Sequence, residues 1–400
     1  MKSSQVVLYL DFDKIEIKVS SMINNEYEII EKKSYDFSLF NSLEQDKEKV
    51  ILYFKKIISK YKNLESSLVI ADTFLKNIEI KKNVSSFAVK KYVNESILKS
   101  CVNDIEELNG KSNYKYSKNQ WALFKLFDCE ETIKKYQYFP FHKEGNKLEV
   151  ESYVIELDKN KDFLEIANFF NSKNIYFNNY FLKSQVIVPS YGTIEKTSIF
   201  INMEDKIISI NKFFNGTIME HHQIDYNIVQ KVKEYTKNKF YDYDESEIKL
   251  LINSVLHNWK NNFKGALTKG VRDFIKNSFG EIVYQIVQII SKWKDFDRHE
   301  GIIIVKGLEN KIITNNLCSL GFNAMNHDPF YSNNILKNDI VSGTLFLTKN
   351  YISKLKDNVV TLDSTKLIKT KPKPGLNFLN VFSSFFRKMF KKRRGEQHAK

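Results

Sequence analysis

The stretch SIFINMEDKIISINKFFNGTIMEHHQI places three charged residues, Glu204, Asp205 and Lys206, in the first bend of a predicted three-stranded meander. Alternating apolar residues predict the strands, and Asn215-Gly216 is typical of a two-residue hairpin turn. A bend that grips phosphate usually carries glycine, because its backbone must approach the ligand closely. The predicted strands and turns therefore suggest a phosphate-binding hairpin, whereas the side chains in its bend are typical of a charged, solvent-exposed hairpin tip.

The N-terminus has the same order of elements. Strands are predicted for VVLYLDF, IEIKVSS and EYEIIEKKSY, followed by a helix from about Leu43 to Tyr61 and the strand SLVIAD. In the second half, the apolar strand EGIIIVKG follows a long helix-rich stretch in the same way. Asp11 and Asn202 occupy equivalent places after their first strands. The chain is therefore predicted to consist of two α/β halves, each opening with a β-meander.

A separate α+β module is predicted between the halves, over residues 77 to about 160. It has a helix near Tyr92 to Leu108 and a strand at KLEVESYVIEL. Residues 226 to 298 read as mostly helical, as the spacing of apolar residues in IVYQIVQIISKW indicates.

Composition excludes several classes of protein. Four hundred residues predict two or more domains, and 13 Gly with 5 Pro exclude a collagenous or wholly disordered chain. The three cysteines are far apart, which indicates a reduced cytoplasmic compartment without a disulfide framework or a zinc site. Neither an export signal nor a membrane span is expected.

The net charge of +14 belongs to the C-terminal segment. Residues 366 to 400 contain eleven Lys or Arg and one acidic residue, Glu396, and therefore hold +10 of the total. After a Pro-containing linker, the segment NFLNVFSSFFRKMFKKRR (377–394) predicts a helix with one apolar half and one basic half. Such a helix is typical of a segment that lies flat on an anionic membrane surface. The residues expected to bind the membrane are Phe378, Leu379, Val381, Phe382, Phe385, Phe386, Met389, Phe390, Arg387, Lys388, Lys391 and Lys392.

Two α/β halves that each begin with a β-meander are typical of the actin and Hsp70 ATPase superfamily. Within this superfamily, the chain resembles the bacterial cell-division protein FtsA. LDFDKIEIKV matches the first phosphate hairpin of that family, and INMEDKIISINKFFNGTI matches the second. IIIVKGLENKI stands where the family has its adenosine motif. The resemblance implies an α/β, actin-like, two-lobed fold of duplicated RNase H-like halves, with an inserted 1C subdomain and a C-terminal amphipathic helix.

The resemblance also divides the chain into subdomains. They are 1A (1–76 and 161–194), 1C (77–160), 2A (195–225 and 283–360) and 2B (226–282), followed by a linker (361–376) and the membrane-targeting helix (377–394).

In this family the hairpin backbones approach the phosphates of ATP, which is bound with Mg²⁺, so the resemblance assigns nucleotide-site positions to this chain. These positions are Asp11, Asp13, Lys14, Asn202, Glu204, Asp205, Lys206, Lys306 and Gly307. Acidic residues replace glycine at Asp13, Glu204 and Asp205, and one carboxylate about 4 Å from a phosphate charge costs roughly 4 kcal/mol. Lys14, Lys206 and Lys306 could partly neutralise a triphosphate, and Asp11 could hold a metal-bound water. The balance favours a degenerate site, so no catalytic activity and no metal site is expected.

By resemblance, the chain is an actin-like cell-division protein that ties FtsZ filaments to the cytoplasmic face of the inner membrane at the division site and helps to assemble the divisome. Its expected partners are the FtsZ C-terminal peptide, its own copies in a filament, anionic lipids and other divisome proteins, but not nucleic acid. Two alternatives stay open: an active ATPase of the same fold with a divergent site, and a nucleic-acid-binding protein with a basic tail. The pilus-assembly actin homologues are disfavoured because they lack a membrane-binding tail helix.

Overall fold

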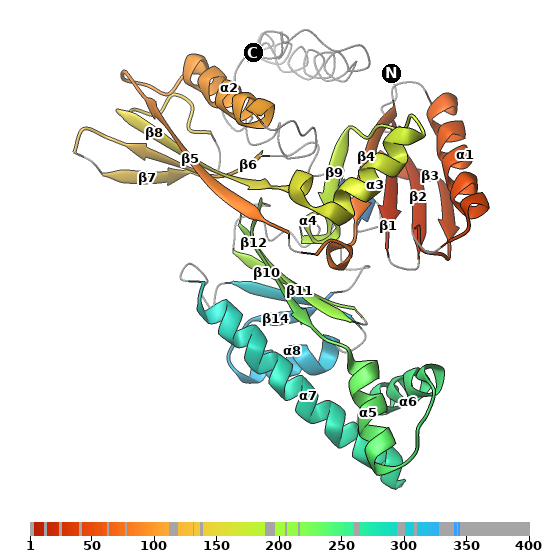
Figure 1. Cartoon of the computed structure of the whole chain (residues 1–400). Coiled ribbons are helices and arrows are strands. Elements are labelled where there is room, and N and C mark those ends of the chain that lie inside the picture. The colour runs from red at the N-terminus through yellow and green to blue at the C-terminus, as the bar shows by residue number, and fades with distance from the viewer. Residues whose placement is uncertain are drawn as a thin grey trace, which may run out of the picture. The chain divides into compact units, whose positions relative to one another are not determined.

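The computed structural model describes most of the chain between residues 4 and 344. The described residues are 4–11, 14–23, 26–39, 42–61, 64–76, 78–111, 119–130, 132–136, 139–188, 197–204, 206–214, 217–259, 265–293, 301–307, 310–327, 340–341 and 343–344. The chain divides into two compact units, whose elements Figure 1 labels. Unit 1 comprises Met1–Leu75, Lys81–Val186 and Asn334–Lys400, and unit 2 comprises Lys76–Ile80 and Ile187–Asn333.

Unit 1 is built on a five-stranded sheet with the strand order β3-β2-β1-β4-β9. β1 pairs antiparallel with β2 and parallel with β4, while β3 and β9 extend the sheet on either side. All residues of β1 are buried, which accounts for its nearly continuous apolar sequence. The strands are β1 (Ser4–Leu10), β2 (Ile15–Ile23), β3 (Glu26–Tyr35), β4 (Leu64–Ile70) and β9 (Asn179–Leu182).

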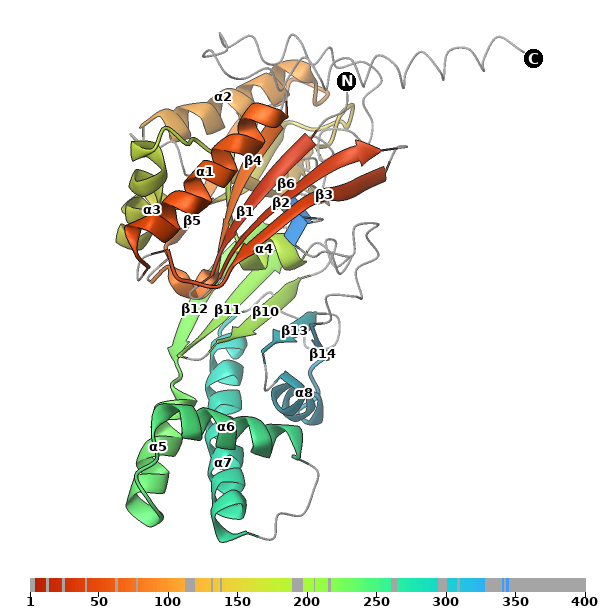
Figure 2. The ribbon, with the colours of Figure 1, turned by 90° about the vertical axis from the view of Figure 1, so that its right-hand side faces the viewer.

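Helices of unit 1 pack on the sheet through aromatic side chains. The ring of Phe54 on α1 lies 5.4 Å from that of Phe177, and the ring of Phe163 on α3 lies 5.5 Å from that of Tyr180 on β9. Figure 2 shows α1 lying across the sheet. The helices are α1 (Glu44–Lys60), the 3-10 helix η1 (Asp72–Phe74), the 3-10 helix η2 (Leu157–Lys159), α3 (Lys161–Ser172) and α4 (Lys183–Ile187).

A second sheet in unit 1 has the order β5-β8-β6-β7 and packs with α2. Its core includes Trp121, Phe124 and Phe139. This module contains the helix and the last strand expected between residues 77 and 160, although its assignment as an FtsA-type 1C subdomain stays a prediction. The elements are β5 (Ile80–Ala88), α2 (Glu95–Lys111), β6 (Asn119–Phe127), β7 (Ile133–Tyr136) and β8 (Lys147–Ile155).

Unit 2 is built on a five-stranded sheet with the order β12-β11-β10-β13-β14. β10 pairs antiparallel with β11 and parallel with β13. The face of β10 that carries Ile199 and Ile201 packs in one core with Ile275 and Phe279 of the long helix α7. The strands are β10 (Ser198–Met203), β11 (Ile207–Phe214), β12 (Thr217–Asp225), β13 (Ile302–Lys306) and β14 (Ala324–Asn326).

Three helices of unit 2 lie beside one another in both ribbon views (Figures 1 and 2). α6 begins with a capping box, in which Asp244 and Glu247 each accept the other's backbone N–H. The helices of this unit are α5 (Ile228–Lys239), α6 (Glu245–His257), α7 (Ala266–Ser291) and α8 (Asn310–Ser319). The predicted subdomain boundary at residues 282 and 283 falls within α7. Among the described residues, no helix is both long and apolar enough to cross a membrane.

The two large sheets have the same strand order and the same pattern of directions. In each sheet, the two successive strand pairings on one side of the first strand are antiparallel, and the two successive pairings on its other side are parallel. This repeated RNase H-like order confirms the duplicated, actin-like α/β fold class. The predicted strands agree with the observed ones to within a few residues, while the Asn24-Asn25 and Asn215-Gly216 turns lie outside the described residues.

Candidate functional site: the two strand-end hairpins

The first hairpin joins β1 to β2 in unit 1. Asp11 follows β1, and its backbone N–H donates to the carbonyl of Lys14 at 2.8 Å. This bond closes a four-residue turn between two antiparallel strands. Asp13, the expected glycine position, lies outside the described residues.

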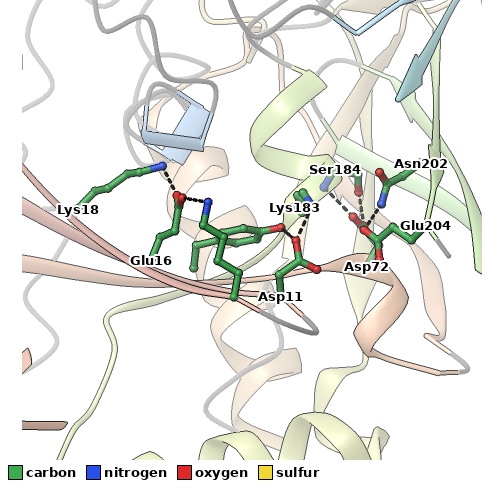
Figure 3. A network of polar contacts seen from close by, with 10 residues as sticks. Asp11, Glu16, Lys18, Asp72, Lys183, Ser184, Asn202 and Glu204 are labelled. Atoms are coloured by element: carbon green, nitrogen blue, oxygen red, sulfur yellow. Dashed lines mark hydrogen bonds and ion pairs between the residues drawn. The ribbon is translucent and has the colours of Figure 1, made fainter. Parts of the chain in front are cut away.

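The carboxylate of Asp11 is held by two side chains of its own unit. The Tyr9 hydroxyl and the Lys183 ammonium both donate to Oδ2 of Asp11, the ammonium from 3.0 Å. The side chain of Lys183 is 7% exposed and that of Asp11 is 21% exposed, so water screens the pair weakly. The Lys183 ammonium also lies 5.0 Å from the centre of the Tyr9 ring, a distance that allows a cation–π contact. Figure 3 shows the ammonium of Lys183 beside the carboxylate of Asp11.

Lys183 reaches Asp11 because the parallel strands β4 and β9 extend the sheet beside β1. The carboxyl ends of parallel strands meet at one edge, and Lys183 is the first residue after β9. The next residue, Ser184, donates its backbone N–H at 2.9 Å and its hydroxyl to the carboxylate of Asp72, which follows β4. Asp72 is fully buried, and burial raises its pKa although Ser184 and Lys183 oppose that rise.

Lys14 is engaged on the other side of the hairpin. Its ammonium lies 2.5 Å from Glu16. Glu16 also binds the buried Lys18 (Figure 3). The hydrogen bond with Glu16 is the main cause that raises the pKa of Lys14. Burial works to raise the pKa of Glu16, but the two lysines outweigh it and lower that pKa. The ammonium of Lys14 is therefore already paired with a carboxylate of β2, the strand that follows it.

The second hairpin joins β10 to β11 in unit 2. The backbone N–H of Glu204 donates to the carbonyl of Ile207 at 3.1 Å, and the side-chain amide of Asn202 donates to the Glu204 carboxylate at 2.6 Å. Asn202 is 1% exposed. The carbonyl of Lys206 accepts the backbone N–H of Tyr226 at 2.7 Å. Asp205 lies outside the described residues.

β13, which pairs with β10 beside this hairpin, is followed by a glycine, and a close contact explains why a glycine stands there. Lys306 pairs with Asn202 in the parallel register, and Gly307 follows with φ of 138°. A Cβ on Gly307 would lie 2.7 Å from Cβ and 2.8 Å from the carbonyl oxygen of Met203. Gly307 is thus required for the close approach of β13 to β10, whatever the site binds.

Neither hairpin, taken by itself, fits a magnesium triphosphate. Asp11 already has the Lys183 ammonium on its carboxylate, and Glu204 presents a second carboxylate at the equivalent turn. The backbone N–H groups of Asp11 and Glu204 both point to carbonyls of their own hairpins. Within the described part of the chain, no group of three His, Cys, Asp or Glu side chains could hold a metal ion.

The structure brings the predicted residues together in two sets. Asp11 and Lys14 flank the first turn, and Asn202, Glu204, Lys206, Lys306 and Gly307 surround the second. The membrane-binding residues of 377–394 lie outside the described residues. Sequence reasoning missed Lys183, Ser184 and Asp72, although a charged residue directly after a short apolar strand was a usable signal.

No family model matches the chain. It is 27% identical over 265 residues to an uncharacterized mitochondrial protein, RF1, of Saccharomyces cerevisiae. The match covers 62% of this chain and 52% of the yeast protein, so the chain spans about half the length of that relative.

Three solved structures illustrate the fold comparison. The PilM-PilN type IV pilus biogenesis complex has a TM-score of 0.44, with 8% identity, over 82% of this chain and 88% of that chain. MreB5 of Spiroplasma citri, solved with ADP, has a TM-score of 0.42, with 8% identity, over 88% and 98%. EutJ of Carboxydothermus hydrogenoformans has a TM-score of 0.39, with 7% identity, over 86% and 88%. All three TM-scores are below 0.5, so the fold assignment rests on the strand order of the two sheets.

Proposed function

We propose that this chain is a non-enzymatic, actin-like scaffold of the bacterial division machinery, which ties FtsZ filaments to the cytoplasmic face of the cell membrane. The proposal that the chain is not an enzyme rests on one observation: Lys183 and Tyr9 already donate to the Asp11 carboxylate. We call the first hairpin closed in this sense. An ATPase needs that edge to receive a metal and phosphates, whereas a scaffold needs only a stable fold. The closed hairpin therefore favours the scaffold over an active ATPase.

The tether is proposed from the sequence of residues 377–394. One half of the predicted helix carries Phe378, Phe382, Phe385 and Phe386, and the other carries basic and small polar side chains. Full burial of each Phe contributes about 1.5–3 kcal/mol, and each Lys or Arg near an anionic leaflet adds about 1 kcal/mol. Phosphate binding by a nucleic-acid-binding tail requires basic side chains but no apolar face, whereas a membrane surface binds both. The membrane is therefore the favoured partner.

The FtsZ peptide is proposed to bind on residues 226–282, which contain α5, α6 and most of α7. Lys231, Lys237 and Lys239 of α5 are exposed, which suits a peptide with acidic side chains. Lys237 is paired with Asp242 at 2.9 Å, so an acidic peptide would compete with this exposed ion pair. Self-association into filaments and contacts with other divisome proteins complete the proposed role.

Sedimentation with anionic liposomes tests the tether. The full-length chain is expected to pellet with the liposomes, and Phe382→Glu with Phe386→Glu is expected to stay in the supernatant. Ser383→Glu with Ser384→Glu adds the same two charges to the polar half of the helix and should still pellet. Equal pelleting of both double variants would show that the apolar face is not what binds, and the tether proposal would fail.

A further inference from the structure

Two successive residues of unit 1 hold the ends of two neighbouring strands. Lys183 binds Asp11 after β1, and Ser184 binds Asp72 after β4. β1 and β4 are parallel and end in register, with Leu10 opposite Ile70. The two carboxylates therefore lie at the same edge of the sheet, and the Lys183-Ser184 dipeptide clamps both (Figure 3).

The charged groups at this edge resemble those of a metal site, except that the positive charge is supplied by a lysine side chain of the protein itself. Carboxylates at the ends of adjacent strands are ligands that Mg²⁺ and Mn²⁺ prefer. Here the positive charge beside Asp11 is an ammonium, buried and fixed over the Tyr9 ring. A second carboxylate, Asp72, is next to the same dipeptide and has no water access.

We propose that Lys183 is the resident cation of this edge: its ammonium occupies the place at Asp11 that a divalent metal would otherwise take, and it keeps the first hairpin closed without metal or nucleotide. The inference deepens the proposed non-enzymatic role and rests on the same closed hairpin. It assigns Lys183 a function that an ordinary structural ion pair does not have, because removing the ammonium should expose a metal site.

Two variants of Lys183 separate these roles. Lys183→Ala removes the ammonium and leaves space, whereas Lys183→Met removes the charge but fills the space with a side chain of similar length. Binding of Mn²⁺ alone is measured by electron paramagnetic resonance, and the melting midpoint is recorded with Mg²⁺ and with EDTA.

The wild-type chain is expected to bind no Mn²⁺ and to melt at the same temperature with Mg²⁺ and with EDTA. Both variants should melt at a lower temperature, because Asp11 loses its counter-ion. Lys183→Ala should bind Mn²⁺ weakly but saturably, because carboxylate oxygens are ligands that this cation prefers, and Mg²⁺ should restore part of its midpoint. Lys183→Met, and Lys183→Ala combined with Asp11→Asn, should bind none.

A folded Lys183→Ala protein that binds no Mn²⁺ would overturn the inference and leave Lys183 with a structural role only. If that variant is not recovered folded, the wild-type chain decides: saturable Mn²⁺ binding that Asp11→Asn abolishes, or a midpoint lowered by EDTA, would overturn it. Binding of ATP, measured separately, would contradict the proposed function, whereas Mn²⁺ binding by the wild-type chain without nucleotide contradicts this inference.

Discussion

In the first hairpin, the Asp11 carboxylate is held by Lys183, which lies 172 positions further along the chain. In the second hairpin, Asn202 binds Glu204 only two residues away, and the contact joins a neutral amide to a carboxylate. The strand order around both turns is the same. The comparison teaches that the repeated sheet is specified by buried apolar strands, while the polar groups of the two turns are satisfied by different partners, a distant lysine in the first and a near amide in the second.

The strands next to the hairpins differ in the same way. β4 is followed by Ala71, with φ of −59° and its backbone N–H bonded to the carbonyl of Leu10 at 2.9 Å. β13 is followed by Gly307, with φ of 138° and Met203 in close contact. Only the second unit therefore requires a glycine at this place.

Asn202→Asp should have the largest effect, because it turns the second hairpin into a pair of adjacent carboxylates. The side-chain hydrogen bond to Glu204 is lost and a buried negative charge is placed beside the half-buried Glu204 carboxylate, at a cost of about 3 kcal/mol in the free energy of unfolding. Close carboxylates share a proton at a raised pKa, so the loss should shrink as the pH falls from 7 toward 4. Urea denaturation at several pH values measures it.

Asn227→Asp is the matched control for this change. Asn227 caps α5 by accepting the backbone N–H of Gln230, and aspartate caps a helix about as well as asparagine does. Equal losses in the two variants would mean that the Asn202–Glu204 contact does not stabilise the turn.

Gly307→Ala should come next, with a loss of about 3 kcal/mol. The substitution places a Cβ against the Met203 backbone in a conformation that side chains rarely adopt. Gly280→Ala is the control in the same unit: it lies within α7, nothing lies within 4 Å of its Cβ, and it should stabilise the protein by about 0.5–1 kcal/mol. Thermal melts of both variants decide whether the strand end needs glycine.

Acid should weaken unit 2 through His221 on β12. Nδ1 of His221 lies 2.6 Å from Oδ1 of Asn211, and burial lowers the His221 pKa from 6.5 to about 4. The unfolded chain then binds the proton more readily, so stability is lost as the pH falls from about 6.5 to 4, by up to about 3 kcal/mol. His221→Gln should flatten this part of the pH profile, while His222→Gln, on the exposed neighbour, should keep most of it, because burial is the larger cause of the lowered His221 pKa and the charge of His222 the smaller one. An identical slope in wild type and His221→Gln would show that other groups cause the loss.

The fold could be predicted from the sequence because its information is local. Alternating or continuous apolar runs identified the strands, and their repeated order gave the duplication. The residues Asp11, Asn202 and Glu204 were also found, because Asp11 and Glu204 directly follow a strand and Asn202 is the next to last residue of β10. The clamp could not be predicted: Lys183 meets Asp11 only through the parallel pairing of β1, β4 and β9, and no local pattern encodes that register.

Titration calorimetry of the full-length chain with Mg-ATP tests the central claim most directly. The closed hairpin predicts no saturable binding, or a dissociation constant weaker than about 1 mM, which corresponds to a binding free energy no more favourable than about −4 kcal/mol. A micromolar dissociation constant would contradict the claim, because the Asp11 carboxylate would have to release the Lys183 ammonium to make room for metal and phosphate.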